Sequence, residues 1–531
     1  MTAAARGRGP ALVVGGIAGA QLLALAIFAV AARQLPLNDD WVYSEPARRL
    51  ATGHGLHLFP EVAVPAIPQI GLGALAWALH PSHSALRLES LLAAAAAVVL
   101  VVVLSRRLGA RPYWSLLAGA CLAVFPVFAG VSAAFMTEPL YLALLLGTAV
   151  LGLGWLRDGR RSPWILPLLL AAALDRQHAL GIAIALVAAI LAMGGGRRKR
   201  DDLLLLLACL AATAAGLLFP VVADLATPRM GFRVSTAGGS TLHLVVPAVA
   251  YTPRLLGLLT LPFGYALARV AWAGSPARGV VVVSLAAAVL GTASLVLPDG
   301  ARGTYLTAAG LGPLTLDGDK PLLLTGVLPL LKVLAVAAFT AMVAATYRRV
   351  RVRALSPAMV FLVVLALTQA APMLTFSVYD RYYLPVLVIL LPMVAVLPGG
   401  DVPSSASAAW AAAALVALGA LFVAGQQDYL AWQASRDRLA QEVAAAQPDA
   451  TLFGGYETYG TYILIPRFEA GMYGGPTGPD LPSFVGPANP GITIEFARRG
   501  DPRPGIDYAS LAPGRVVMVC RHGPCPVVPG R

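Results

Sequence analysis

The sequence predicts a polytopic α-helical membrane protein of about thirteen transmembrane helices with a small C-terminal extracytoplasmic α/β domain. Hydrophobic residues make up 58% of the 531 residues, charged residues make up 12%, and the mean hydropathy is +0.75. Soluble domains of this length do not have such a composition. Runs of roughly 17 to 25 apolar residues, long enough to cross the hydrocarbon core, recur between Ala11 and Ala424. Composition and run length therefore agree on the class.

The predicted spans are 11–32, 85–105, 113–131, 137–156, 163–175, 178–193, 203–226, 252–272, 279–298, 322–346, 356–376, 382–398 and 407–424. The segment 66–80 is apolar but short and interrupted by proline, which predicts an interfacial or re-entrant helix. The first run is longer than a usual signal-peptide core, so it is expected to remain as an uncleaved span.

Charge placement orients the chain. The net charge is +13, but its clusters follow the predicted topology and so do not indicate nucleic-acid binding. They all fall on one side when the spans alternate: Arg6 and Arg8, Arg106-Arg107-Arg111, Arg157-Arg160-Arg161, Arg197-Arg198-Lys199-Arg200 and Arg348-Arg349-Arg351-Arg353. The positive-inside rule makes this side cytoplasmic, together with the N-terminus. We expect a transmembrane domain at 1–424 with a first outer loop at 33–84, and an extracytoplasmic domain at 425–531.

The C-terminal segment differs in composition from the rest. Residues 426–447 have helical periodicity, and LFGGYETYGTYILIP (452–466) predicts aromatic strands around a Gly-Gly turn. Cys520 and Cys525 lie in the part expected outside, where an oxidising compartment permits a disulfide. A metal site that includes His522 is the sharper alternative for this pair. Cys121 and Cys209 fall in predicted spans and are interpreted as packing residues.

Polar residues gather at the predicted outer ends of the spans. Four clusters do so: Asp39-Asp40 with Tyr43, Glu45 and Arg48; Glu138; Asp175-Arg176-Gln177-His178; and Asp380-Arg381-Tyr382-Tyr383. Each alone could anchor a helix at the interface. Together they supply carboxylates that can take a proton and arginines that can hold a phosphate bidentately. This is the set of groups that acid/base chemistry on a lipid phosphate requires.

The segment LNDDWVYSEPARRLATG resembles the first outer loop of GT-C glycosyltransferases, above all their aminoarabinose-transferase and protein O-mannosyltransferase-like branch (family 39-like). The family pattern is roughly Asp-Glu-x-x-Tyr-x-Glu-x-x-Arg, and Asp40 stands here in place of the Glu. Further similar segments follow in order: ALRLESLLAAAAAVVLVVVLSRRLGAR (85–111), AFMTEPLYLALLLG (134–147), DRYYLPVLVILLP (380–392) and GGYETYG (454–460). The segment PEVAVPAIP keeps Glu61 but lacks the lysine that aminoarabinose transferases carry there.

The resemblance implies a GT-C-like fold at a plasma membrane, and transfer of a sugar from a polyprenyl-phosphate donor with inversion at the anomeric carbon. The acceptor would be a glycan, a lipid or a protein. We assign the base to Asp39 and an orienting role to Asp40 or Glu138. Arg381 and Arg176 are the candidates for holding the donor phosphate, with Tyr382 and His178 beside them, although a buried structural histidine is an equal reading of His178.

A divalent metal is the one cofactor left open. Its candidate ligands have no diagnostic spacing: Glu61, His54, His57, Glu138 and His243.

Three other classes compete with this interpretation. A transporter or flippase of lipid-linked sugars also places ionisable residues in the membrane, but it favours internal repeats or broken mid-membrane helices. Here the acids lie at span ends and no repeat is apparent. A surface-glycan polymerase or ligase would favour a long basic central loop, and the loops 227–251 and 299–321 are modest. A membrane scaffold would not require acids clustered on one face.

Overall fold

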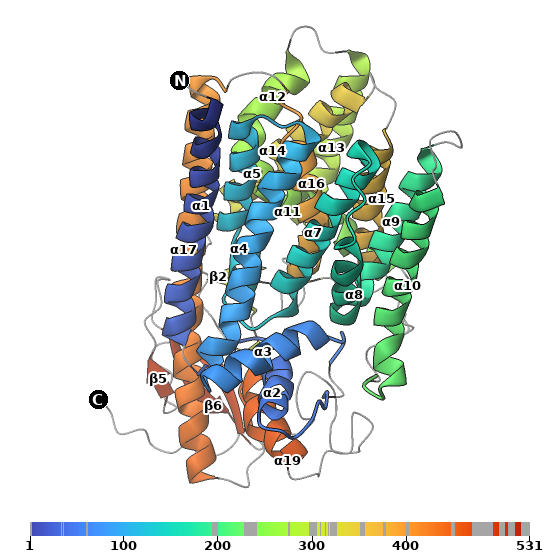
Figure 1. The fold of residues 1–531 in the computed structure, drawn as a ribbon. Helices are drawn as coiled ribbons and strands as arrows, with labels where there is room; N and C mark the ends of the chain where they lie inside the picture. The colour runs from blue at the N-terminus through green and yellow to red at the C-terminus, as the bar shows by residue number, and fades with distance from the viewer. Residues whose placement is uncertain are drawn as a thin grey trace.

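A helical bundle makes up most of the protein, and a small sheet lies beyond one end of it (Figure 1). The computed structural model describes the chain except for these residues: 1–2, 33, 36, 60–61, 194–199, 228–241, 274–276, 297–304, 308–309, 314, 317, 319–326, 351–355, 375–378, 400–402, 448–451, 470–491, 499–504, 508–515 and 522–531.

The helices of the first half are α1 (Ala3–Ala32), α2 (Asp40–Ala51), α3 (Ile67–Leu79), α4 (His83–Leu108), α5 (Pro112–Val124), α6 (Pro126–Ser132), α7 (Thr137–Asp158), α8 (Ile165–Asp175), η1 (Gln177–Ala179), α9 (Leu180–Ala192) and α10 (Arg200–Val222). Those of the second half are α11 (Leu242–Thr260), η3 (Leu261–Phe263), α12 (Gly264–Trp272), α13 (Arg278–Val296), α14 (Leu328–Val350), α15 (Pro357–Ala370), η4 (Ala371–Leu374), η5 (Asp380–Tyr383), α16 (Leu384–Val394) and α17 (Ser405–Ala446).

Every predicted span overlaps a helix of the structure. Within the described residues, seven helices are long and apolar enough to cross a membrane, or eight if the pair α5 and α6, bent by 60°, counts as one span. The remaining predicted spans fall on shorter apolar helices or on the partly described α1. The prediction of many apolar helices is therefore confirmed, while the number thirteen stays a prediction.

The acid Glu138 and the clustered arginines at the other helix ends lie at opposite ends of the bundle. Glu138 lies in the first turn of α7 and Arg157 in its last turn, a separation of about 30 Å at 1.5 Å per residue. Arg106 likewise lies in the last turn of α4, and Arg349 near the end of α14 donates to the carbonyl of Leu397 at 3.1 Å. This distribution is the one that the positive-inside rule leads us to expect, and the sidedness itself stays a prediction.

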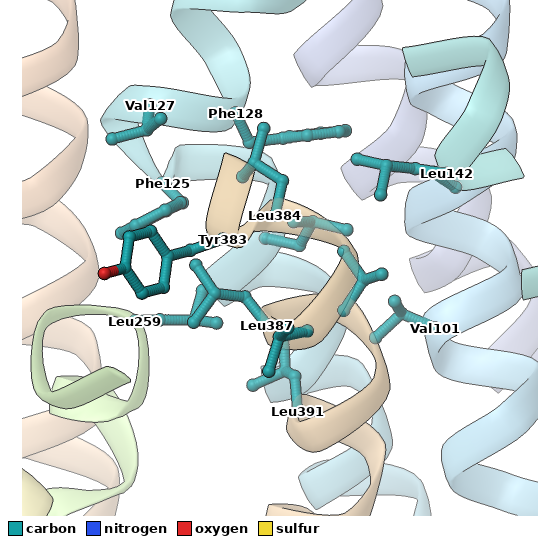
Figure 2. Packing of buried hydrophobic residues seen from close by; sticks show 14 of the residues in the cluster. Val101, Phe125, Val127, Phe128, Leu142, Leu259, Tyr383, Leu384, Leu387 and Leu391 are labelled. Atoms are coloured by element: carbon teal, nitrogen blue, oxygen red, sulfur yellow. The ribbon is translucent and has the colours of Figure 1, made fainter. Parts of the chain in front are cut away.

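The apolar core surrounds α16. Figure 2 shows side chains of this helix and its entry turn packed among residues of α4, the α5–α6 bend, α7 and α11. The labelled residues are Val101, Phe125, Val127, Phe128, Leu142, Leu259, Tyr383, Leu384, Leu387 and Leu391. The segment that follows Arg381 is thereby anchored in the centre of the protein.

Small and apolar residues complete the packing of the bundle. A Cβ on Gly257 would lie 1.8 Å from the carbonyl oxygen of Ala335, so only glycine lets α11 and α14 approach this closely. The outer helices α10 and α13 instead expose large apolar side chains, for example Val222 and Val289 at 84% and 70%. Such surfaces suit contact with lipid chains.

The first outer loop is folded against the end of the bundle. It contains α2 and α3, and α3, with 13 residues, is too short to cross a membrane and contacts α2, α4 and α8 (Figure 1). A second apolar cluster forms here, with Trp41 and Phe59 of the loop packed near Tyr459 of the C-terminal region. The expectation that 66–80 forms a helix without spanning agrees with this placement.

The C-terminal region begins inside the longest helix. Helix α17 has 42 residues, about 63 Å, so its second half extends beyond the bundle (Figure 1), and the helix predicted at 426–447 is confirmed. A four-stranded sheet of order β3-β4-β6-β5 packs against that half. The strands are β3 (Leu452–Phe453), β4 (Ile492–Arg498), β5 (Gly505–Asp507) and β6 (Val516–Arg521), with β3 and β4 parallel and the other pairs antiparallel.

One prediction for this region is wrong. Only β3 of the segment 452–466 is a strand, and the chain continues as α18 (Tyr456–Tyr459), η6 (Gly460–Leu464) and α19 (Ile465–Glu469). Gly455 ends the strand with a φ of 85°, a conformation that favours glycine. The tyrosines then pack on the first outer loop, so tertiary contacts override the strand propensity of aromatic residues.

The predicted disulfide falls mostly outside the described residues. Cys520 lies in β6 opposite Ile494, its side chain is not described, and Cys525 lies among the residues that the structure leaves out. Cys121 and Cys209 are buried free thiols, as their positions in apolar segments indicate.

Candidate active site

Two carboxylates and two guanidinium groups meet at the end of the bundle where α2 begins. Asp39 is the N-cap residue of α2, and its carboxylate accepts a hydrogen bond from Arg381 of η5 at 2.5 Å. Glu138, in the first turn of α7, forms an ion pair with Arg176 at 2.7 Å, and its Oε1 lies 3.8 Å from Nε of Arg381. We call these four residues, Asp39, Glu138, Arg176 and Arg381, the charge quartet. Each of the four clusters that the sequence singled out contributes one residue to it.

The quartet is balanced in charge but retains unused polar atoms. Glu138 is 2% exposed, Arg176 5% and Arg381 7%. Within the described residues, Glu138 Oε2 and the Nε and Nη1 atoms of Arg381 have no hydrogen-bond partner. Arg176 is held in place by Thr137, whose hydroxyl accepts from Nε at 3.0 Å. Buried donors without partners are costly, so Nε and Nη1 of Arg381 are well suited to a ligand that brings acceptor oxygens.

The environment of Asp39 favours proton uptake. Burial raises the pKa of the Asp39 carboxyl above its usual value, and the positive charge of Arg381 partly opposes this rise. The negative charges of Glu138 and Glu457 also raise the Asp39 pKa. Burial lowers the pKa of Arg381, but Asp39, Tyr382 and Glu138 raise it, and the net result lies above its ordinary value, so the arginine keeps its charge.

Aromatic rings surround Arg381. Its guanidinium carbon lies 5.5 Å from the ring centre of Tyr379 and 5.4 Å from that of Tyr382. Tyr382 is half-buried, whereas Arg381 itself is buried. Such cation–π contacts restrict where the guanidinium plane can lie.

Asp40 does not join the quartet. It is fully buried, accepts from Arg87 of α4 at 2.8 Å, and caps the chain by accepting from the backbone N–H of Leu37 at 2.9 Å. The two adjacent carboxylates thus face different partners. The orienting role proposed for Asp40 falls more naturally to Glu138.

His178 lies beside the quartet and not in it. Its ring is 6.4 Å from that of Tyr141, its backbone carbonyl accepts from the side chain of Gln369 at 3.0 Å, and its Nδ1 has no partner among the described residues. Gln369 in turn accepts from the hydroxyl of Tyr141 at 2.8 Å. His178 is therefore placed to line the site without contacting the arginines by a hydrogen bond.

The metal candidates do not converge in the part of the chain that the structure describes. That part contains no group of three His, Cys, Asp or Glu side chains able to hold a metal ion. His54 and His57 are exposed, and His54 contacts the hydroxyl of Thr52 at 2.9 Å. Glu61 and the side chain of His243 lie outside the described residues.

The sequence did not predict the contacts that hold Asn38, the residue before Asp39. Asn38 has a φ of 54°, and its side chain donates to the hydroxyl of Tyr305 at 3.1 Å. Its backbone N–H donates to Glu457 of α18 at 3.3 Å. Only the fully polar triplet Asn38-Asp39-Asp40 hinted at a turn here, because the partners are hundreds of residues away.

An apolar groove opens near the quartet. It runs between α11 and α14 and is lined by Tyr251, Arg254, Leu255, Leu258, Leu306, Leu328, Leu331, Lys332 and Ala335. The backbone N–H of Leu306 donates to Asp380 at 2.8 Å, directly before Arg381 in the chain. The groove is thus connected to the site through one short segment.

Comparison with known proteins gives structural similarity only. No family model and no curated protein matches the sequence. The structure is similar to that of ArnT from Cupriavidus metallidurans bound to undecaprenyl phosphate, with a TM-score of 0.46 and 15% identity over 96% of this chain and 99% of that chain. For ArnT in the apo state the TM-score is 0.41 and the identity 14%, over 98% of this chain and 100% of that one.

A third similar structure is the archaeal oligosaccharyltransferase AglB from Archaeoglobus fulgidus in complex with an inhibitory peptide and a dolichol-phosphate. Its TM-score is 0.41 and its identity 16%, over 89% of this chain and 61% of that chain. The function of the present chain is inferred below from the side chains of its own site.

Proposed function

We propose that the protein is a membrane glycosyltransferase that moves a sugar from a polyprenyl-phosphate donor to an extracytoplasmic acceptor with inversion of the anomeric carbon. The acceptor is a glycan, a lipid or a protein. The single observation that carries this proposal is the charge quartet. It combines a carboxylate at the edge of the bundle with two buried arginines, one of which has unused donor atoms.

The reaction needs both kinds of group. The acceptor hydroxyl attacks the anomeric carbon, the bond from that carbon to the phosphate oxygen breaks, and the hydroxyl proton passes to Asp39 as general base. The departing polyprenyl phosphate gains negative charge, which the guanidinium groups of Arg381 and Arg176 stabilise. Glu138 holds Arg176 and faces Arg381, and so keeps both cations oriented.

The pairing of Asp39 with Arg381 gives the donor a second role. Arg381 occupies the carboxylate of Asp39 in the structure described here. A phosphate that binds the unused Nε and Nη1 atoms of Arg381 shares the positive charge of this guanidinium and weakens its pairing with Asp39. Donor binding then makes the Asp39 carboxylate more available for the acceptor proton.

We assign the isoprenoid chain of the donor to the groove between α11 and α14. Its wall is mostly aliphatic and also includes Arg254 and Lys332. Leu306 of its wall donates to Asp380 at 2.8 Å, so the groove lies next to the segment that carries Arg381. These features support one continuous donor site.

The test uses purified protein in liposomes with a labelled polyprenyl-phosphate sugar and a set of acceptors. We expect labelled product and free polyprenyl phosphate in equal amounts, with the release depending on acceptor. Arg381→Ala weakens donor binding and reduces this turnover. Arg161→Ala, which removes the pairs with Asp201 and Asp202 at the opposite end of the bundle, leaves it unchanged. Movement of intact donor across the bilayer without cleavage would refute the proposal and favour a flippase.

A further inference from the structure

The residue before the proposed base is held by the C-terminal region. Asn38 is 5% exposed and adopts a left-handed φ of 54°, which costs free energy unless neighbouring groups fix it. Its backbone N–H donates to Glu457 Oε1 at 3.3 Å and its side chain donates to the hydroxyl of Tyr305 at 3.1 Å. Both bonds come from segments distant in sequence, and both act on the residue that precedes Asp39.

Glu457 is itself fixed. Its side chain is fully buried, and its Oε2 accepts from Arg436 of α17 at 2.7 Å and from Thr315 at 2.8 Å. Gln433, one turn earlier on α17, donates to Oε1 at 3.4 Å. A carboxylate held on both oxygens cannot follow Asn38 if Asn38 moves. Glu457 therefore acts as a fixed point for the start of α2.

Further contacts join the segment 456–469 to α2. A Cβ on Gly460 would lie 2.2 Å from the ring of Trp41, so the backbone lies directly on that side chain, and Tyr456 packs on Trp41 with ring centres 5.2 Å apart. At the other end of α2, Arg48 pairs with Glu469. The segment thus contacts α2 at its first and last turns.

Tyr305 links the residue before Asp39 to the residue before Arg381. While its hydroxyl accepts from Asn38, its backbone N–H donates to Asp380 at 2.9 Å, next to Arg381. Displacing Asn38 would change the distance between Asp39 and Arg381, because each is anchored through its preceding residue.

We propose that Glu457 is a positioning residue, which holds Asn38 through its backbone N–H and thereby sets where the Asp39 carboxylate stands. The role of Asp39 as base rests on the proposed function, whereas the contact between the C-terminal region and Asn38 does not. On this account the C-terminal region is a part of the active site through Glu457, which acts on Asp39 by way of Asn38.

The charge of Glu457 gives a second readout. The charged groups that face Asp39 are Arg381 from η5, Glu138 from α7 and Glu457 from α18, and the last two raise the pKa of Asp39. Glu457→Gln keeps an oxygen acceptor for Asn38 but removes one negative charge. The acid limb of the rate profile should therefore move to lower pH in this variant, which a residue that only stabilises the fold would not cause.

The positional test needs a variant that folds. Glu457→Leu alone leaves Arg436 buried without its acid, so it is combined with Arg436→Met, because replacing a buried ion pair by apolar residues of similar size is often tolerated. The matched control is Tyr462→Phe, which removes a hydrogen bond of 2.9 Å to Asp437 between the same C-terminal segment and α17.

Two measurements are made on full-length protein. Amide hydrogen exchange of residues 37–44 should be at least about ten-fold faster in the double variant than in wild type or Tyr462→Phe. In the transfer assay, kcat should fall by about 10- to 100-fold with the donor KM within about two-fold, since misplacing a base by ~1 Å has this effect. Glu457→Gln should keep most of the kcat and show the shifted acid limb.

The outcomes separate the two proposals. Unchanged exchange at residues 37–44 in the folded double variant overturns the positioning role, whether or not the protein transfers sugar. Faster exchange with wild-type kcat and an unmoved acid limb in Glu457→Gln also overturns it, because Asn38 would then not control the base. If wild type shows no transfer while the exchange result holds, the proposed function fails and the contact to Asn38 stands.

Discussion

Replacing Asp40 is expected to reduce stability and not to impair chemistry directly. Asp40 and Arg87 are both fully buried, and their charged atoms lie 2.8 Å apart. Arg87 also donates to the carbonyl of Leu35 at 2.5 Å, and Asp40 accepts from Leu37, so the pair closes the connection between α1 and α2. Removing the acid takes away the carboxylate that balances the buried charge of Arg87 at the start of α4.

The magnitude follows from that burial. Breaking a buried pair by removing one partner costs about 3 to 5 kcal/mol, whereas replacing both partners by apolar side chains is often neutral. Asp40→Ala should therefore lower the free energy of unfolding by about 4 kcal/mol, and Asp40→Leu with Arg87→Met should recover most of the loss. The control is Asp201→Ala, whose acid is 68% exposed and pairs with Arg161 at 3.3 Å. It should change the free energy of unfolding by about 1 kcal/mol or less.

The assay is equilibrium unfolding of purified protein in mixed micelles, followed by tryptophan fluorescence, because Trp41 lies next to the substituted residue. The milder variant Asp40→Asn keeps an acceptor for Leu37 and remains measurable if the alanine variant does not fold. Stability within about 1 kcal/mol of wild type for both single variants would refute this role. Normal stability with lost turnover would instead assign Asp40 a role in the transfer reaction.

Three further predictions concern topology, the tail and the donor. An impermeant thiol reagent added to whole cells should fail to label a cysteine introduced at Arg106 but should label one introduced in 425–531, and tail labelling only after lysis would contradict the orientation. If Cys520 and Cys525 are disulfide-bonded, only two of the four thiols react under denaturing, non-reducing conditions, and four reactive thiols would exclude the bond. Arg381→Ala should weaken donor binding and turnover together, because the phosphate is held in both the ground and the transition state; unchanged donor affinity would assign the phosphate elsewhere.

Much of the site could be predicted because span ends constrain it. Once Asp39, Glu138, Arg176 and Arg381 are assigned to one end of their helices by charge distribution, a bundle must bring them near one another. No such rule exists for the choice between two adjacent acids. Asp39 and Asp40 differ by one residue, and only the direction of each side chain at the first turn of α2 decides which meets Arg381 and which meets Arg87.

The supporting contacts could not be predicted from sequence. Asn38 and Glu457 are 419 residues apart, and no periodicity relates the first loop to the C-terminal region. The aromatic residues of the segment 452–466 predict strands, yet its tyrosines lie in short helices, and Tyr456 packs on Trp41. Local propensity fails there because the packing partner lies in another part of the chain.

The most direct test of the central claim is the turnover of Asp39→Asn, measured by transfer from a labelled polyprenyl-phosphate sugar with monodisperse protein. Asparagine keeps the shape and removes the proton affinity, so turnover should fall by about 10²- to 10⁴-fold while the protein still binds donor.

The pH dependence sharpens this measurement. Burial raises the pKa of Asp39 above 3.8, and a base acts only when deprotonated, so wild-type activity should be full above that raised pKa and lost as the pH falls through it. The acid limb should be absent from the residual activity of Asp39→Asn. Wild-type turnover in this variant, with an unchanged acid limb, would contradict the account and assign the base to another carboxylate.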